Sequence, residues 1–103
     1  MFLARVEGSV VATKKDASMA GRKLLLVRPQ RVDEKDPTKF RAGANTIIAV
    51  DSVGAGIGEM VMFCQGSSAR LAPNLKDAPV DAVIIGIVDV VDVQGKQIYN
   101  AKT

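Results

Sequence analysis

Five short aliphatic runs dominate this sequence, and each is followed within two residues by glycine, proline or a charged residue. They occupy residues 2–12, 24–27, 46–50, 60–64 and 83–93. Valine, isoleucine and leucine are frequent in these runs, and β-branched side chains fit the pleated, half-buried surface of a sheet. In the first run Ala4 and Val6 alternate with Arg5 and Glu7, which is the period of a strand. The pattern predicts an all-β protein.

The spacing of these strands favours a small barrel. Gly8 interrupts the first strand and predicts a bend or a close backbone approach, as barrel strands require. One short helix is expected at residues 66–71, and strands and helices do not alternate regularly. We therefore predict a small five-stranded OB-like barrel with one short helix. We expect residues 29–43 to form a flexible loop, residues 83–93 one strand and residues 97–99 a short edge.

The length of the chain fits a single domain that covers residues 1–103. A chain of this mass can bury about 65% of its unfolded surface, which is enough for one core. Hydrophobic residues make up 48% of the sequence, a high share for so short a chain. We therefore expect part of the apolar surface to be buried against other subunits.

Several kinds of chemistry are excluded or made improbable by composition. The chain has no histidine, which removes histidine-activated nucleophiles and most transition-metal sites. Its single cysteine, Cys64, lies in an aliphatic run and is interpreted as a small core residue. We predict no catalytic residues, no metal site and no cofactor. The aliphatic runs are too short to span a bilayer, and no signal peptide is recognisable, so we expect a soluble cytoplasmic protein.

Charge is distributed unevenly along the chain. Residues 1–41 hold ten Lys/Arg and five Asp/Glu, whereas residues 42–103 hold four and six. The basic half could meet nucleic acid or an acidic partner surface, or could simply be a solvated loop. No clustered basic run of the kind that binds a phosphate backbone is present.

Two short motifs resemble functional signatures. The glycines at 54, 56 and 58 suggest a dinucleotide-binding turn, but residues 59–64 after them are strand-like, whereas that fingerprint must open a helix. Ser67 and Ser68 before Arg70 suggest a nucleophile or an anion site at a helix start. Without histidine, an N-cap and an arginine that pairs with a carboxylate are the favoured interpretation.

Two alternative functions remain open at this level. OB-folds often bind single-stranded nucleic acid, which requires aromatic stacking platforms along a basic groove. Phe2, Phe40, Phe63 and Tyr99 are too scattered to predict such a platform. A subunit of an enzyme that lacks its own active site is the other alternative.

The motifs together resemble those of the EutN/CcmL proteins. The resemblance rests on Ala4-Arg5-Val6-x-Gly8-x-Val10-Val11-x-Thr13, Gly21-x-Lys23-Leu24-Leu25-Leu26-Val27, Ala49-Val50-Asp51-Ser52-Val53-Gly54-Ala55-Gly56-x-Gly58-Glu59, Gly66-Ser67-Ser68-Ala69-Arg70 and Pro79-Val80-Asp81-Ala82-x-Ile84-Ile85-Gly86-Ile87-Val88-Asp89. These blocks follow one another in the expected order over nearly the whole chain. Residues 28–44 match no family motif and receive no role.

The resemblance implies a structural, non-enzymatic shell protein at the vertex of a bacterial microcompartment. It implies a homopentamer that caps a corner of the shell and meets hexameric shell proteins, with no membrane and no nucleic-acid partner. The sequence around Asp51 and Asp89 is more similar to proteins of catabolic compartments than to those of carboxysomes.

Two groups of residues are expected to serve assembly. We expect the loop Gly54, Ala55 and Gly56 to lie near the five-fold axis, where only small residues fit. We also expect Ser67, Ser68 and Arg70 at the subunit interface, with Asp51 or Asp81 as acidic partners for Arg70.

Overall fold

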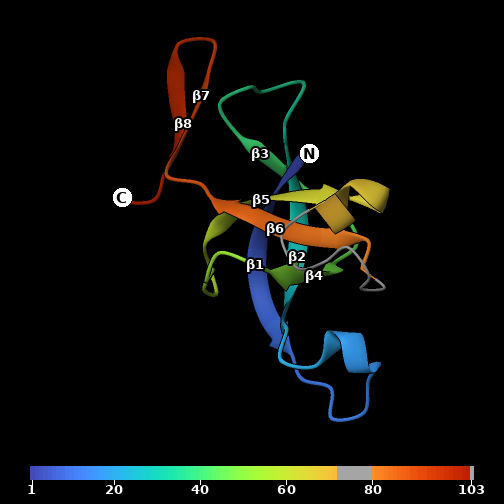
Figure 1. The fold of residues 1–103 in the computed structure, drawn as a ribbon. Helices are drawn as coiled ribbons and strands as arrows, with labels where there is room; N and C mark the ends of the chain where they lie inside the picture. Colours follow the sequence, from blue (N-terminus) through green and yellow to red (C-terminus); the bar gives the residue numbers. More distant parts are fainter. Residues whose placement is uncertain (72–79, 103) are drawn as a thin grey trace.

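The computed structural model describes residues 1–71 and 80–102, without the side chains of Ser67, Ser68 and Arg70 (Figure 1). The chain runs through β1 (Phe2–Val10), η1 (Ala17–Met19), β2 (Lys23–Val32), β3 (Phe40–Ala42), β4 (Ile47–Asp51), β5 (Met60–Gln65), η2 (Gly66–Leu71), β6 (Ala82–Ile87), β7 (Val90–Val93) and β8 (Lys96–Asn100). The two helical segments are short 3₁₀ helices of three and six residues, so the protein is nearly all β.

Five strands close into a barrel. Around it β1 pairs with β2, β2 with β4, β4 with β6, β6 with β5, and β5 again with β1. Only β4 and β6 pair in parallel; the other four contacts are antiparallel. The prediction of a five-stranded OB-like barrel is confirmed.

The barrel is filled by small and medium apolar side chains that alternate along the strands. This core consists of Ala4, Val6, Leu25, Val27, Ala49, Ala55, Val61, Phe63, Ala82 and Ile84. A second, smaller cluster on the outside joins Val50 of β4 and Val83 of β6 to Ala69 and Val80. The short helix η2 therefore closes one outer face of the barrel, with Ala69 as its buried residue.

Gly8 marks an irregularity in the first strand, as predicted. The register between β1 and β2 shifts between Val6 and Gly8, so one extra residue is accommodated in β1. Such a bulge bends the strand and increases its twist, which helps β1 to pair with both β2 and β5.

The expected flexible loop at 29–43 is wrong at both ends, which are strands. β2 continues through Pro29 to Val32, and β3 folds back on it to form a hairpin. Proline is tolerated because β4 pairs with β2 only as far as Val27, so the missing N–H interrupts no β2–β4 bond. The Pro29 carbonyl accepts a hydrogen bond from the Gly43 N–H at 2.9 Å and fixes the base of the hairpin.

The single strand expected at 83–93 is also wrong. β6 ends at Ile87, and β7 begins at Val90 in a separate two-stranded sheet with β8, which contains the predicted edge at 97–99. The Val88 N–H donates to the Met60 carbonyl at 2.8 Å, and the chain then leaves the barrel. Aliphatic residues continue on both sides of this break, so the sequence pattern does not reveal it.

Two hairpins project from the same end of the barrel (Figure 1). One is formed by β2 and β3 and the other by β7 and β8. The molecule measures 45 × 25 × 23 Å, and its radius of gyration is 14.4 Å. A compact chain of this length would have a radius of about 13 Å. The hairpins extend the molecule at one end, and the segment that contains η1 extends it at the other (Figure 1).

Candidate functional site

The glycine-rich loop after β4 is held by one buried carboxylate. Asp51 Oδ1 accepts hydrogen bonds from the N–H groups of Val53 at 3.0 Å and Gly54 at 3.2 Å, and Oδ2 accepts from Ala55 at 2.8 Å. Lys23 Nζ lies 3.4 Å from Oδ2 and donates to the Ala55 carbonyl at 2.8 Å. The Asp51 side chain is only 1% exposed, so these groups satisfy its charge inside the protomer.

The second half of the loop is attached to β1. The Gly58 N–H donates to the Val6 carbonyl at 2.8 Å, and Arg5 Nη1 donates to the Gly58 carbonyl at 2.9 Å. A carboxylate oxygen of Glu59 accepts the Gly56 N–H. The backbone of the loop is therefore fixed at both ends by bonds within one chain.

The local backbone conformation and packing explain why this loop contains glycine and alanine. Gly54 and Gly58 have φ of +82° and +89°, which residues with a Cβ rarely adopt. A Cβ on Gly56 would lie 3.2 Å from the Glu59 carboxylate, and the Ala55 methyl is buried in the barrel core. A position near the five-fold axis stays a prediction, but crowding by other copies is not needed to account for small residues here.

The same geometry argues against a phosphate-binding loop. The N–H groups of Val53, Gly54, Ala55 and Gly56 all donate to the carboxylates of Asp51 or Glu59. A phosphate cradle needs free N–H groups and positive surroundings, whereas this loop wraps around two acidic side chains.

Among the predicted interface residues, the structure describes the side chains of Asp51 and Asp81. Asp51 is enclosed within its own protomer, while the Asp81 side chain is exposed and its backbone carbonyl accepts the Gly66 N–H at 2.7 Å. η2 begins at Gly66, and the side chains of Ser67, Ser68 and Arg70 lie outside the described residues. Their predicted N-cap and interface roles stay predictions.

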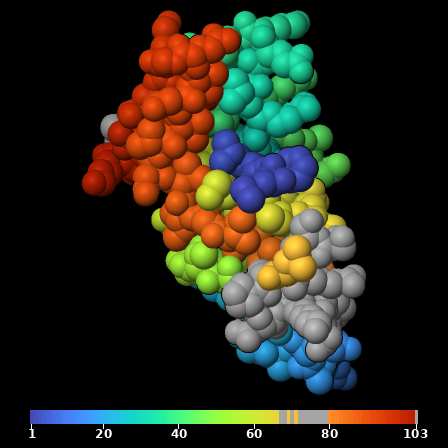
Figure 2. Space-filling model, turned by 45° about the horizontal axis from the view of Figure 1, so that its top comes forward, coloured from blue at the N-terminus to red at the C-terminus, as the bar shows by residue number. Residues whose placement is uncertain are grey.

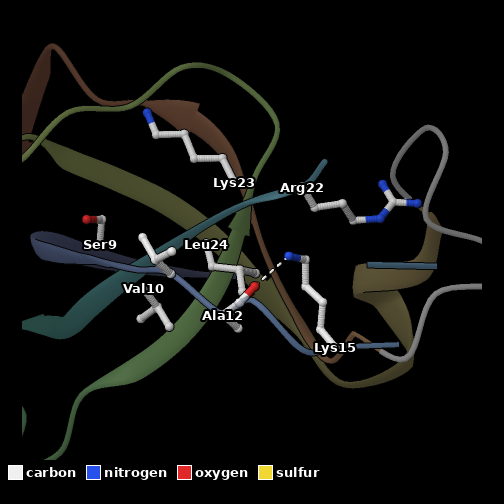
Figure 3. Close-up of a pocket in the computed structure, with 8 residues that line it drawn as sticks. Ser9, Val10, Ala12, Lys15, Arg22, Lys23 and Leu24 are labelled. Atoms are coloured by element: carbon white, nitrogen blue, oxygen red, sulfur yellow. Dashed lines mark hydrogen bonds between the residues drawn. The ribbon is translucent and has the colours of Figure 1, made fainter. Parts of the chain in front are cut away.

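A hollow of about 250 Å³ near the end of β1 is lined by three cationic side chains (Figure 3). Lys15 Nζ donates to the Ala12 carbonyl at 2.6 Å, and Arg22 Nε donates to the Ser18 carbonyl at 2.9 Å. Lys23 is bound to Asp51 and the glycine-rich loop. In Figure 3 the Arg22 and Lys23 side chains extend in opposite directions. The three charges therefore do not converge on one ligand position.

A second hollow, of about 500 Å³, is mainly apolar and lies where β1 begins and β5 ends. Met1, Phe2 and Leu71 border it and are 72%, 51% and 85% exposed. Cys64 lines this hollow and is half-buried rather than part of the barrel core. Exposed apolar side chains grouped in this way are typical of a surface that contacts another protein.

The described residues indicate neither a metal site nor a membrane-spanning helix. Within residues 1–71 and 80–102, no three His, Cys, Asp or Glu side chains are grouped as metal ligands. Nor does this part of the chain contain a helix long and apolar enough to cross a membrane.

The fold and these surfaces define a barrel protein built for association. Its polar loop is closed by its own carboxylates, whereas large apolar side chains remain exposed. The family model of the ethanolamine utilisation protein EutN and carboxysome proteins matches residues 1–89. This chain belongs to the EutN/CcmL family, as its motifs predicted.

Curated relatives and solved structures agree with this assignment. The chain is 47% identical over 89 residues to the bacterial microcompartment shell vertex protein PduN of Salmonella typhimurium, covering 86% of this chain and 96% of that protein. It is 41% identical over 102 residues to the carboxysome shell vertex protein CcmL of Gloeobacter violaceus, covering 99% of this chain and 96% of that protein.

The structure of that CcmL superposes with a TM-score of 0.87 at 40% identity and full coverage of both chains. GrpN of Rhodospirillum rubrum, described as a pentameric microcompartment shell protein, superposes with a TM-score of 0.74 at 40% identity. That match covers 90% of this chain and 98% of GrpN.

Proposed function

We propose that this chain is a structural shell protein whose homopentamer caps a vertex of a bacterial microcompartment. The observation that carries the proposal is the match to GrpN, a pentameric shell protein, over 98% of the length of GrpN. Relatives at 41–47% identity are named as shell vertex proteins. A shell tiled by six-fold units needs five-fold corners to close, and a dedicated pentamer supplies them.

The surfaces of the protomer fit a ring of this kind. A cyclic ring uses heterologous contacts, in which one surface meets a different surface of the next copy. The apolar hollow bordered by Met1, Phe2 and Leu71 supplies one such surface. Within this proposal Ser67, Ser68, Arg70 and Asp81 contribute to the seam, and the loop at Gly54–Gly56 lies towards the five-fold axis. Asp51 contributes indirectly, because it fixes that loop.

The proposed location is the shell itself, inside the cytoplasm, with hexameric shell proteins as the neighbours of the pentamer. We place the protein in a catabolic compartment rather than a carboxysome. The sequence around Asp51 and Asp89, which is more similar to the catabolic kind, supports this placement.

The proposed role is structural and includes no catalysis. The polar side chains around the glycine-rich loop and the cationic hollow are directed to backbone groups of their own chain. Single-stranded nucleic-acid binding is less well supported. Phe63 is buried and packs on Phe2 at 5.5 Å, and Tyr99 lies on Arg5, so these rings do not form a continuous stacking platform.

Native mass spectrometry of the purified chain tests the proposal directly. We expect one species at about five times the 10.9 kDa of the protomer. Co-expression with hexameric shell proteins should then yield closed polyhedral particles, whereas omission of this chain should leave sheets or open tubes. A monomer or a dimer at micromolar concentration would contradict the pentameric vertex.

A further inference from the structure

The two projecting hairpins carry charges that their own protomer leaves unpaired. Arg31 of β2 and Arg41 of β3 stand directly opposite each other in the antiparallel register, and both are exposed. Like charges in this position destabilise a strand pair. Neither guanidinium makes a hydrogen bond or an ion pair with any residue that the structure describes.

The arginine pair borders a hollow of about 240 Å³ with Val32 and Glu34. Glu34 is exposed, and no ion pair joins it to either arginine within the described residues. The opposite face of the hairpin holds the half-buried pair Val32 and Phe40 at the next register position. The arginines therefore occupy the outward face, where an anionic group from another molecule can reach both.

The β7–β8 hairpin carries an exposed acidic side chain, whose charge is opposite to that of the arginine pair. Tyr99 faces its own barrel, where Arg5 lies 5.3 Å from the ring centroid, and Val91 is its cross-strand partner. The register to β8 shifts between Val91 and Asp92, but burial still alternates along β7: Val90 and Asp92 are exposed, whereas Val91 and Val93 are half-buried. The Asp92 carboxylate is exposed and has no partner among the residues described.

This hairpin has little to hold it within its own protomer. It is a two-stranded sheet of its own and contributes no residue to the two buried hydrophobic clusters. An isolated two-stranded hairpin is marginally stable in water. The barrel closes through β1, β2, β4, β6 and β5, so it is complete without this hairpin. The exposed side chains of the hairpin are therefore accessible to other molecules.

The exposed area of the chain is sufficient for such contacts. Its accessible surface is 6648 Å², about 1,000 Å² more than a compact monomer of this mass exposes. A stable interface buries about 800 Å² on each partner. The surplus surface is therefore of the size that a neighbouring copy covers.

The two hairpins lie side by side at one end of the protomer (Figure 2), as in Figure 1. Lys96 at the tip of β7–β8 is close enough to contribute to the lowered pKa of Asp36 in the β2–β3 loop. In a ring with heterologous contacts, one surface of each protomer meets a different surface of the next copy.

We propose that Arg31 and Arg41 of one protomer receive Asp92 of the adjacent copy of this chain. The occupant of the arginine face is thus a second copy. The contact repeats around the ring, between the β2–β3 hairpin of one copy and the β7–β8 hairpin of the next. This inference rests on the proposed pentamer and names the residues that set its register. It also gives a role to residues 28–44, for which no family motif supplied one.

Charge reversal and its rescue test the contact in the full-length chain. The variant R31E/R41E should raise the protein concentration at which half of the pentamer dissociates by about tenfold or more. D92R alone should have a similar effect, and the triple variant R31E/R41E/D92R should restore most of the wild-type value. The milder R31Q/R41Q serves if reversal perturbs folding, which circular dichroism reports.

A matched control makes the same change of charge on the same hairpin. The variant K35E/K39E replaces two exposed lysines of the loop and should leave dissociation within about twofold of wild type at physiological salt. Native mass spectrometry over a dilution series gives the readout for all variants.

Each outcome is decisive. If the wild type is pentameric and R31E/R41E does not weaken it, or weakens it without rescue by D92R, the inference is wrong while the proposed function stands. If the wild type itself is not an oligomer, the proposed function fails, and the seam fails with it.

Discussion

The glycine-rich loop and the β2–β3 hairpin both involve charged side chains, but among the described residues the Asp51 carboxylate at the loop has a counter-ion and the two facing arginines of the hairpin do not. In the loop, Asp51 is paired with Lys23 and with three backbone N–H groups, and Arg5 is bound to the Gly58 carbonyl. In the hairpin, Arg31 and Arg41 face each other without a counter-ion among the described residues. Charges that are satisfied internally stabilise the protomer, whereas charges left unpaired on an outward face are available to other molecules.

The barrel and the hairpins also differ in how deeply their side chains are buried. Barrel residues form a core with side chains that are almost fully buried, while the hairpins hold half-buried residues. Substitutions in the barrel region should therefore act on folding, and those on the hairpins should act mainly on assembly. The following variants test this contrast.

The largest effect is expected from truncating an aromatic side chain in the barrel. Phe63 is 1% exposed, so Phe63→Ala leaves a cavity and should lower the free energy of unfolding by about 3–5 kcal/mol. Phe40 of β3 is only half-buried, so Phe40→Ala should cost about 1 kcal/mol. Urea denaturation followed by circular dichroism measures both. Equal losses at the two positions would remove the distinction between barrel and hairpin.

Removing the charge of Asp51 should have the next largest effect. Asp51→Asn loses an acceptor for the loop N–H groups and leaves Lys23 without its counter-ion, so we expect a loss of about 2–3 kcal/mol in unfolding free energy. The exposed Asp89 provides the control, and Asp89→Asn should change this free energy by less than about 0.5 kcal/mol. An unchanged melting curve for Asp51→Asn would show that the loop does not depend on this carboxylate.

Variants of two glycines distinguish the effect of backbone conformation from the effect of limited space. Gly54→Ala forces a Cβ into φ of +82° and should destabilise the protein by about 1 kcal/mol. Gly8 does not have positive φ, and a Cβ there meets no atom within 4 Å, so Gly8→Ala should be close to neutral. Thermal unfolding of the two variants in parallel provides the measurement. A neutral Gly54→Ala would point instead to crowding by other copies as the reason for glycine.

The smallest effect concerns pH and the loop of the β2–β3 hairpin. Hydrogen bonds from the Thr38 hydroxyl, and then from its N–H, lower the pKa of Asp36 below its ordinary value. Because the folded-state pKa is the lower one, the stabilisation is present above the unfolded pKa of about 3.9 and is lost as the pH falls through the folded value.

Thr38→Ala should return the pKa of Asp36 towards its ordinary value, which carboxyl chemical shifts in an NMR titration report. Asp16, whose pKa is lowered by Ser18 in a different loop, should be unaffected and serves as the internal reference. If the Asp36 titration is unchanged in Thr38→Ala, the hydroxyl is not the main cause of its lowered pKa.

The sequence predicted the positions of the barrel strands because each depends on local information. Alternation in residues 2–10, aliphatic runs elsewhere and the bend at Gly8 are all properties of neighbouring residues. Family motifs lie in the same segments, so the assignment to the EutN/CcmL family could also be made without coordinates.

Other features were decided only by the tertiary structure. The break between β6 and β7 falls at Val88 and Asp89, between two aliphatic segments, and its position depends on where pairing with the distant strand β5 ends. Pro29 is compatible with β2 only because β4 has already ended beside it. Likewise, only the fold shows that Lys23 and the loop N–H groups surround Asp51, whose place at a subunit seam stays a prediction.

The physical reason is the same in each case. Local propensity and hydrophobic period are set by residues a few positions apart, so a single sequence is enough to indicate them. The partner of a charge, the end of a strand pair and the face that stays exposed depend on residues that meet only after the barrel closes. For this protein the sequence determined the strands and the family, and the closed barrel decided which charges stabilise the protomer and which remain on its surface.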